Sequence, residues 1–564
     1  MFSLKDRASW TGAQARSQFR QNVFPEAHTN GMSNGFTQTS VHIIPSSQAK
    51  HFAEFCRMNH VPCPLLYRSN TGEVSAPPLA ANVDIRTDQS AYGIYENGVC
   101  SKTVTDLLDI PFDEFVTFYV GCSSSFELAL QDADLPVRHV QIGRSVPSYK
   151  TKVPCVTSGP FSGKVIMSMR PMPRNLVERA AQVTAFLDKV HGAPTHIGEA
   201  SCIGVEDLHN PEFDDKPNIR EGDVCMYWGC GTTATMAIIN AKLPLAISLS
   251  PTANCCNFIS DLNNDAFNKM NVPRWMEFLQ TKAPFITENP VFGSLVSDKA
   301  LELIQQLEKP LRRDPIKSLL SCVVDDTVDS LAKAALRLSH ASFVAIVTSN
   351  DISTKEGLGV LSIMKSLLAT DSKEVVLLVP EDKLAEWKNA ISSGIDCKLL
   401  KKTVDVRKIE TRDGSSKDDV LKLSRHVLST MEGFKLDDVR PRRFTALVAC
   451  DGKGGFWVES AVELLMEANV EAYVNNSSDG SWPGEIIATA LYILNCCPIH
   501  SRYQRRGLGL HKPLQQSVFL VTYEELANLT SKLEFSFDTQ VVKDLVEKTN
   551  ASASSVLECL GVKD

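Results

Sequence analysis

The second half of the chain alternates uninterrupted apolar runs with amphipathic segments. The apolar runs are residues 343–349 (FVAIVTS), 374–380 (EVVLLVP) and 444–450 (FTALVAC). Residues 328–341, 359–370, 381–394 and 417–433 instead repeat apolar positions every three or four residues, which predicts helices. Strands that are apolar on both faces need helices on both sides. The pattern therefore predicts an α/β fold with a predominantly parallel sheet covered by helices.

The first half has shorter β-rich runs separated by loops rich in glycine and proline, and its clearest helix covers residues 176–190. This pattern predicts a mixed α/β module with short strands. A chain of 564 residues is too long for one hydrophobic core, so several domains are expected. The expected parts are an extension at 1–14, a module at 15–262, a mostly helical bridge at 263–312 and an α/β domain at 313–564.

Charge and hydropathy exclude some classes of protein. A formal net charge of -8 disfavours a general nucleic-acid binder, because phosphate contacts need a basic face. No run reaches the roughly 18 apolar residues that a membrane span needs. The 16 cysteines include adjacent pairs but no repeated zinc-ligand spacing. We therefore expect buried thiols in a reducing compartment, and no metal.

The N-terminal stretch is basic, and two interpretations stay open. Four basic residues and one acid in the first 20 residues are compatible with part of a mitochondrial transit segment. The alternative is an amphipathic helix with Arg16 and Arg20 on one face.

Two loops of the second half are candidate anion sites. CDGKGG (450–455) follows an expected strand, so its backbone amides and Lys453 could hold an anion; a plain tight turn is the alternative. GSWPGE (480–485) opens an expected helix, with Ser481 as its cap. A helix N-terminus suits a carboxylate, and an ordinary cap is the alternative.

Two stretches of the first half have similar potential. Ser123, Ser124 and Ser125 precede an expected helix and offer hydroxyls and clustered amides to a carboxylate. Serine capping with Glu127 as its partner is the alternative. Arg170 is expected at a strand end before two prolines, where it is either a carboxylate clamp or half of a structural ion pair.

The stretch HGAPTHIGEA (191–200) crowds turn-forming residues around His191 and His196, which is typical of a loop that presents side chains. Cys230, in a glycine turn after an expected strand, would need a base to act as nucleophile, and these histidines could supply one. A buried structural thiol is the alternative. The histidine spacing is not that of helical zinc sites.

Several motifs occur together and in order: DIRTD (84–88), GCSSSFELAL (121–130) and HGAPTHIG (191–198) among them. Over residues 15–262 they resemble the bacterial putative hydro-lyase family. RRFTALVAC (442–450) and the stretch 477–509 are similar to the partner domain of D-glutamate cyclase. The order of the two modules resembles the animal mitochondrial D-glutamate cyclases.

The resemblance implies a hydro-lyase that interconverts D-glutamate and 5-oxo-D-proline plus water, with no cofactor. Such a site needs a general base near the amine and a general acid near the carboxyl group. The implied acid/base residues are Asp451 and Asp479. The implied substrate-binding residues are Lys453, Gly480, Ser481, Arg170, His191, His196, Ser123, Ser124 and Ser125. The implied location is the mitochondrial matrix, with the cytoplasm as the alternative.

The second half departs from the family pattern. The glycine-rich acidic loop ending in Asn-Glu is missing, and NNSSDG (475–480) is its best remnant. Two further hypotheses therefore stay open: a catalytically impaired relative that binds a small acidic amino acid, and a hydro-lyase acting on another small carboxylic acid. The expected partner is a small acidic amino acid rather than nucleic acid or membrane, and a homo-oligomer is compatible with the sequence.

Overall fold

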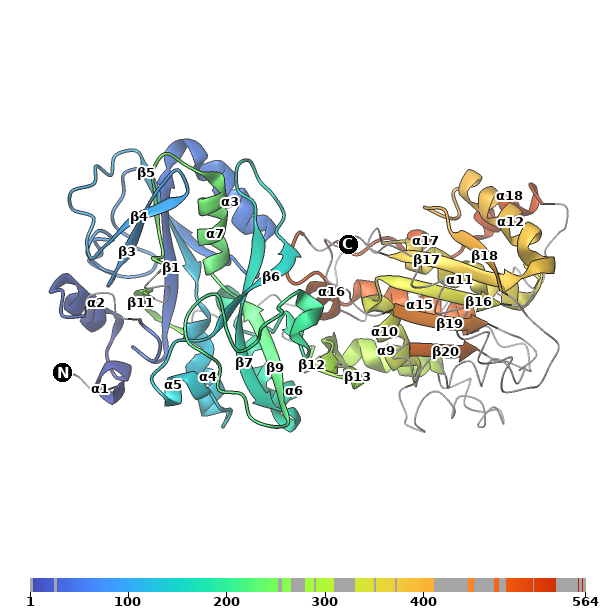
Figure 1. The fold of residues 1–564 in the computed structure, drawn as a ribbon, viewed down its shortest axis with the longest axis horizontal. Helices are drawn as coiled ribbons and strands as arrows, with labels where there is room; N and C mark the ends of the chain where they lie inside the picture. Colours follow the sequence, from blue (N-terminus) through green and yellow to red (C-terminus); the bar gives the residue numbers. More distant parts are fainter. Residues whose placement is uncertain are drawn as a thin grey trace. The chain divides into compact units, whose positions relative to one another are not determined.

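The computed structural model describes residues 4–24, 28–251, 256–264, 279–288, 291–308, 330–348, 351–370, 373–409, 445–450, 471–475, 483–510 and 512–533, together with Val556 and Leu560. The chain divides into two compact units (Figure 1). Unit 1 contains Met1–Leu295, Val439–Pro441 and Arg502–His511, and unit 2 contains Val296–Asp438, Arg442–Ser501 and Lys512–Asp564. A short segment from late in the chain therefore belongs to unit 1.

Among its described residues, unit 1 contains two larger antiparallel sheets, the antiparallel pair β13–β14 and seven α-helices. Its strands are β1 (Phe36–Pro45), β2 (Leu65–Arg68), β3 (Tyr92–Glu96), β4 (Val99–Val104), β5 (Phe115–Gly121), β6 (Ser148–Pro154), β7 (Lys164–Pro173), β8 (His196–Ile197), β9 (Asp223–Gly229), β10 (Ala246–Ser248), β11 (Phe258–Asn263), β12 (Thr281–Lys282), β13 (Phe285–Glu288) and β14 (Val291–Gly293). Its helices are α1 (Leu4–Ala8), α2 (Gly12–Arg20), α3 (Ala49–Met58), α4 (Glu127–Asp132), α5 (Arg138–Gln141), α6 (Val177–Ala185) and α7 (Thr232–Ala241). The larger sheet has the order β2-β5-β1-β10-β3-β4, with β11 also paired to β1, and the smaller has the order β6-β7-β9-β8.

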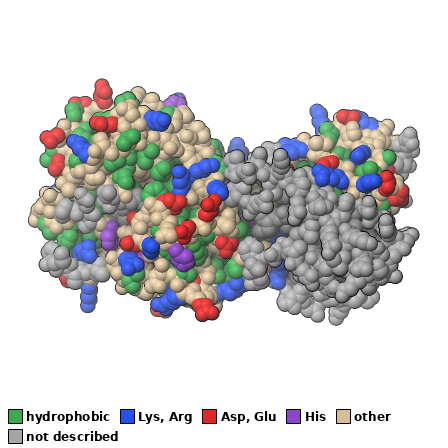
Figure 2. Space-filling view, viewed as in Figure 1, with side chains coloured by type: hydrophobic (Ala, Val, Ile, Leu, Met, Phe, Trp, Pro, Cys, Tyr) green, Lys and Arg blue, Asp and Glu red, His purple; other side chains and the backbone are tan. Residues whose placement is uncertain are grey.

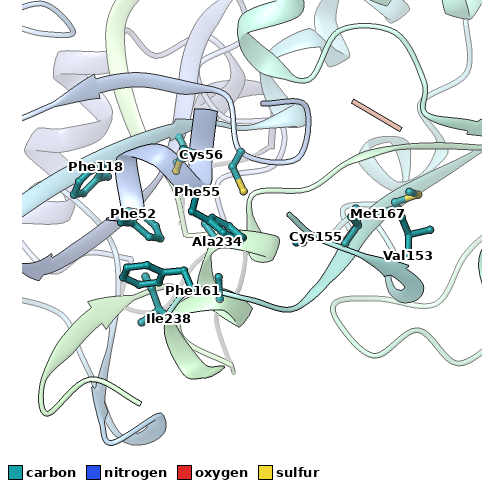
Figure 3. Close-up of a cluster of buried hydrophobic side chains, with 14 of the residues drawn as sticks. Phe52, Phe55, Cys56, Phe118, Val153, Cys155, Phe161, Met167, Ala234 and Ile238 are labelled. Carbon is teal, nitrogen blue, oxygen red and sulfur yellow. The ribbon is translucent and has the colours of Figure 1, made fainter. Parts of the chain in front are cut away.

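Strand β5 of the larger sheet is buried on both faces. Side chains alternate along a strand, so Val116 and Phe118 join one hydrophobic core while Phe115 and Tyr119 join the other. In the first core, the ring of Phe52 lies 4.8 Å from that of Phe118 (Figure 3). The end of β5 is thereby fixed from both sides, which positions the turn that follows it.

Strand β7 continues through two prolines, which corrects one expectation. We expected Arg170 at a strand end, but β7 runs on to Pro173 and places Arg170 inside the strand. Beyond Ser168, β7 is paired with β9 alone among the described strands, because its pairing with β6 stops there. A strand with one free side tolerates residues that lack an N–H group.

The segment expected as a helical bridge, 263–312, is helical only in part. Among its described residues, the pair β13–β14 lies in unit 1 and is antiparallel. The expected helix near its end is present as α9 (Asp298–Glu308), in unit 2. The change of unit falls at Leu295–Val296.

The basic N-terminal stretch contains the helix that one of its two interpretations required. Helix α2 starts at a capping box in which Thr11 and Gln14 exchange hydrogen bonds. Arg16 is buried and pairs with Asp261, while Arg20 pairs with the fully buried Asp88. The helix is therefore fastened to unit 1 by charge as well as by packing.

Unit 2 is built around a five-stranded parallel sheet. Its elements are β15 (Val296–Ser297), α9 (Asp298–Glu308), α10 (Ser330–His340), β16 (Phe343–Thr348), α11 (Lys355–Leu368), β17 (Glu374–Pro380), α12 (Leu384–Asp396), β18 (Asp405–Ile409), β19 (Thr445–Cys450), β20 (Glu471–Asn475), α15 (Pro483–Cys496), α17 (Gln516–Phe519) and α18 (Tyr523–Thr530), while α16 (Pro498–Gln504) runs across the change of unit. The strand order is β18-β17-β16-β19-β20, with every pair parallel. This confirms the expected α/β class and the parallel sheet.

The three apolar runs of the sequence form the central strands β16, β17 and β19. The expected helix α10 precedes β16, and the expected helices α11 and α12 lie between the strands in the sequence. Helices α11 and α15 pack closely, because a Cβ added at Gly484 would lie 2.3 Å from the carbonyl oxygen of Gly359. The expected helix at residues 417–433 lies outside the described residues.

The described surface and helices add two observations. On the face drawn in Figure 2, acidic and basic side chains are interspersed over the described surface. None of the described helices has both the length and the apolar character needed to cross a bilayer.

Candidate active site

A buried polar cluster lies beside the turn that follows β5. It consists of Ser123, Glu127, His139, Ser168 and Arg170, which we call the Glu127 cluster. The turn brings Ser123 in the short helix Ser123–Phe126, and α4 begins with Glu127. Strand β7 brings Ser168 and Arg170, and α5 brings His139. Four separate elements of unit 1 thus converge on one charged group inside the fold.

Arg170 is the centre of this cluster. One guanidinium nitrogen, Nη2, donates to Glu127 Oε1 at 2.6 Å and to Ser123 Oγ at 3.1 Å. The other terminal nitrogen donates to Ser168 Oγ at 3.3 Å. The guanidinium carbon lies 4.7 Å from the centre of the Phe126 ring, within the range of a cation–π contact. Both interpretations given for Arg170 needed a carboxylate, and the structure shows an internal one.

Glu127 is ionised at neutral pH although it is buried. Its Oε1 atom accepts from Arg170 and, at 2.7 Å, faces Nε2 of His139. Burial alone would raise the pKa of the Glu127 carboxyl, but the charges and hydrogen bonds of His139 and Arg170 outweigh it and lower the pKa below its ordinary value. Glu127 therefore rests as a carboxylate, and Arg170 and His139 stabilise its charge.

The three serines do not cap a helix, which corrects the capping alternative. Neither the short helix Ser123–Phe126 nor α4 has a side-chain cap, and Glu127 is committed to Arg170. Ser124 donates to Asn30 Oδ1 at 2.8 Å, and Ser125 accepts from the backbone N–H of Gln38 at 2.8 Å. Ser124 and Ser125 instead tie the turn to the N-terminal part of unit 1, and Ser123 belongs to the Glu127 cluster.

His191 is neutral, and its Nδ1 faces a backbone carbonyl group. The side chain is fully buried, and burial is the largest of the effects that lower the pKa of His191 to about 4. Its Nδ1 lies 2.6 Å from the carbonyl oxygen of Val61. A carbonyl only accepts, so Nδ1 carries the proton and Nε2 is left with a lone pair. The charge of Arg170 also lowers the pKa of His191. The His191 loop passes the turn after β5, since a Cβ added at Gly121 would lie 3.3 Å from Cα of Val190.

His196 is buried in an aromatic environment. Its ring centre lies 5.4 Å from that of Tyr227 and 5.2 Å from that of Phe292, and its Nε2 lies 2.7 Å from the carbonyl oxygen of Glu199. These contacts fix the strand β8 against β9.

Cys230 has the surroundings of a structural thiol. Its sulfur donates to Thr232 Oγ1 at 3.2 Å and lies 4.0 Å from Ser148 Oγ. Burial raises the pKa of the Cys230 thiol to about 11, so it is not a thiolate at neutral pH. This favours the structural alternative over the nucleophile.

Four buried atoms of this region have no hydrogen-bond partner among the described residues. Two are donors, Arg170 Nε and Asn30 Nδ2, and two are acceptors, Glu127 Oε2 and His191 Nε2. A buried polar group without a partner costs free energy, so native proteins rarely keep one without a reason. Donors and acceptors together match a ligand that carries both an ammonium group and carboxylates.

The candidate site residues of the second half are not among the residues that the structure describes. Asp451, Lys453, Asp479, Gly480 and Ser481 all lie outside the described residues. The helix expected after them is present as α15. Their assignment therefore stays a prediction.

Sequence reasoning did not identify His139, Asn30 or the catalytic potential of Glu127. Glu127 was considered only as a capping partner, because a glutamate early in a helix usually serves there. His139 and Asn30 had no local signal, since an isolated histidine or asparagine in a loop has many ordinary roles.

Metal ligation was also considered. Within the described residues, no group of three or more His, Cys, Asp or Glu side chains is placed to hold a metal ion, and the described cysteines are free thiols.

Comparison with known proteins places this region in a family. The family described as D-glutamate cyclase matches residues 116–261, which contain every member of the Glu127 cluster. The chain is 42% identical over 238 residues to a protein of Bacillus velezensis named "putative hydro-lyase", covering 89% of that protein and 42% of this chain. It is 38% identical over 258 residues to one of the same name from Geobacillus kaustophilus, covering 97% of it and 46% of this chain.

The fold and these matches define a lyase-type α/β enzyme. The chain belongs to the putative hydro-lyase family, which its resemblance had indicated. The D-glutamate cyclase match falls on unit 1, whereas we had placed the acid/base residues in the second half.

Proposed function

We propose that the chain interconverts D-glutamate and 5-oxo-D-proline plus water, and that the Glu127 cluster with His191 carries the reaction. The proposal rests on one observation above all. Three buried atoms without a partner among the described residues, Arg170 Nε, Glu127 Oε2 and His191 Nε2, belong to the stretch that matches the D-glutamate cyclase family. A site that offers both hydrogen-bond donors and acceptors suits a substrate with an ammonium group and two carboxylates.

The chemistry sets the number of proton transfers. In ring closure the amine nitrogen bonds to the γ-carboxyl carbon, and one carboxyl oxygen leaves as water. The ammonium group loses two protons, and the leaving oxygen gains two. No net proton is exchanged with solvent, so groups that shuttle protons from nitrogen to oxygen are sufficient. Holding the substrate in a ring-closing shape supplies much of the remaining rate.

Each residue of the proposed site has a role that follows from its charge state. Glu127, whose pKa is lowered, accepts a proton from the substrate ammonium group through its free Oε2. His191 Nε2 offers a second lone pair. Arg170, which already pairs with Glu127, offers its remaining donor Nε to a substrate carboxylate.

His139 is proposed as a positioning residue. Its Nε2 holds Glu127 Oε1 and leaves Oε2 for the substrate.

The test is an NMR time course of the purified full chain with 5-oxo-D-proline and with D-glutamate. Glu127→Gln keeps the size of the side chain and removes its charge, so we expect turnover to fall at least about 100-fold, the usual range for a lost acid/base group. Glu54→Gln is the matched control, because Glu54 is an exposed partner of Arg57 on α3.

The same assay compares the two locations proposed for the reaction. Turnover that survives Glu127→Gln but is lost in Asp451→Ala or Asp479→Ala would move the reaction to the second half. If the chain turns over neither compound but D-glutamate raises its melting temperature, it is a binding protein instead. A location in the mitochondrial matrix, or in the cytoplasm as the alternative, stays a prediction.

A further inference from the structure

The segment Arg502–His511 is part of unit 1 although the family match ends at residue 261. Its described residues are built into the fold beside the loop that contains His191. Arg502 forms an ion pair with Asp188 and donates to the carbonyl oxygen of His191 at 3.3 Å. The hydroxyl of Tyr503 accepts from the N–H of Ile197 at 3.0 Å. The function proposed above does not use this segment.

Arg506 is the unusual residue of the segment. Its side chain is 2% exposed, and its Nη1 donates to the carbonyl oxygen of Thr195 at 3.0 Å. Its Nε and Nη2 atoms are buried and have no hydrogen-bond partner among the described residues. These two nitrogens form one edge of the planar guanidinium group, and their N–H bonds point the same way.

The described residues of unit 1 do not neutralise the charge of Arg506. An arginine stays protonated at any ordinary pH, so burial does not remove its charge. The groups that act on it electrostatically include the phenol of Tyr503 and the thiol of Cys202, and neither is a carboxylate. No described carboxylate forms an ion pair with it, whereas Arg502 in the same segment pairs with Asp188. An isolated buried charge is costly, and proteins keep one where it is paired or binds something.

The neighbouring arginine, Arg505, is held by backbone carbonyl groups. Nη1 of Arg505 donates to the carbonyl oxygens of Leu508 and Leu510, at 3.3 and 2.7 Å, and so closes the turn after α16. A structural role of that kind explains the contact of Arg506 with Thr195. It does not explain why the edge formed by Nε and Nη2 of Arg506 has no hydrogen-bond partner among the described residues.

We propose that Arg506 is the centre of a second site, which binds a small oxyanion. The paired N–H groups match two coplanar oxygens, the geometry of a carboxylate or a phosphate. The site shares no residue with the Glu127 cluster. The proposal does not depend on the reaction proposed above. Carboxylate and phosphate share the chemistry that Arg506 recognises, so the test must separate them.

The test is thermal unfolding of the full chain with inorganic phosphate, D-glutamate or 5-oxo-D-proline, each compared with chloride at equal ionic strength. We expect at least one oxyanion to raise the melting temperature by about 5 °C at saturation, as a ligand held only by the folded state does. Performing the series in Glu127→Gln as well keeps binding at the Glu127 cluster apart from binding at Arg506.

The decisive variant is Arg506→Met. Arginine and methionine both carry a Cβ, so the positive φ of 55° costs the same in each. Without anion, we expect the variant to melt at the same temperature as the parent chain or higher, because an unpaired buried charge is gone. With anion, we expect no rise. Arg505→Met, the adjacent control, should keep the anion response.

Two results would overturn the proposal. One is a parent chain that no oxyanion stabilises beyond chloride. The other is an Arg506→Met variant that responds to anion as the parent does. If Arg506→Met does not fold, Arg506→Lys takes its place. Lysine keeps the positive charge but lacks the paired N–H groups of the guanidinium, so we expect the apparent dissociation constant for the oxyanion to rise at least tenfold.

Discussion

The two units treat buried charge differently. In unit 2, the buried ammonium group of Lys365 pairs with Glu525 and also donates to the carbonyl oxygen of Leu520 at 2.8 Å. That of Lys373 donates to two carbonyl oxygens, each at 2.7 Å. In unit 1, Arg170 and Arg506 each keep a buried nitrogen without a partner among the described residues.

The difference separates structural charges from charges available to a ligand. A buried cation whose hydrogen bonds are all met by the chain has nothing left to offer. A cation with a free donor is costly unless a ligand completes it. Unit 1 therefore has the character of a binding unit, and the described part of unit 2 that of a well-satisfied α/β scaffold.

The largest expected effect on the free energy of unfolding comes from replacing a buried cation: Arg170 in unit 1 or Lys365 in unit 2. Arg170→Met strands the ionised Glu127 inside unit 1, so we expect a loss of about 3–5 kcal/mol in the free energy of unfolding. Lys365→Met removes the ion-pair partner of Glu525. Because the Glu525 side chain is 20% exposed, water can solvate its charge, and we expect the free energy of unfolding to fall by only about 1–2 kcal/mol. Calorimetry of the full chain measures both, and equal losses would remove the contrast between the units.

Acid should weaken unit 1 through its buried histidines. The pKa values of His42, His60 and His191 are lowered to about 3, about 4 and about 4, mainly by burial. The unfolded chain takes up these protons near pH 6.5 and the folded chain does not, so stability is full above pH 6.5 and falls as the pH drops toward 4.

His191→Asn tests the size of this effect. Asparagine tolerates the positive φ of 85° at this position and does not ionise. The 2.5-unit difference at His191 corresponds to about 3 kcal/mol, so the variant should lose that much less stability between pH 7 and pH 4. Melting curves at both pH values give the comparison, and an unchanged pH slope would contradict it.

Helix packing in unit 2 gives a smaller effect. Gly484→Ala places a methyl group 2.3 Å from the carbonyl oxygen of Gly359, so α11 and α15 must move apart, and we expect a loss of about 1–3 kcal/mol. Gly394→Ala in α12 is the control: its nearest contact would be Leu400 at 3.3 Å, and alanine favours helix, so the change should be near zero. Urea titration distinguishes the two.

The helix caps should give the smallest effect and the same one in both units. Thr11 closes a capping box on α2 in unit 1, and Thr522 does so on α18 in unit 2. We expect Thr→Ala at either position to cost about 1 kcal/mol, measured as a shift of the melting temperature. Glu525 shares its carboxylate between this cap and Lys365, so a clearly larger loss at Thr522 would show that the two interactions support each other.

The fold of unit 2 was predictable where strands are buried on both faces. The central strands β16, β17 and β19 are apolar throughout and were identified. The strands β18 (DVRKI) and β20 (EAYVN) are at the edges of the sheet, have mixed composition and were not identified. An edge strand has one neighbour fewer and more contact with solvent, so its sequence does not show the continuous apolar run.

The candidate site was predictable only in part. Arg170, His191 and Ser123 were singled out because of prolines, glycines and clustered hydroxyls near them in the sequence. Glu127 and His139 lie 12 residues apart on different helices and come together only through folding.

The sequence by itself determined the alternation of buried strands and helices, because periodicity reports which residues near one another in the chain share a face. Only the tertiary structure decided which polar groups meet. Arg506 reaches the backbone of Thr195 across 311 residues, and no local pattern records such a contact. Which buried donors find an acceptor is settled when the elements pack, and the ones left over in unit 1 point to what the protein binds.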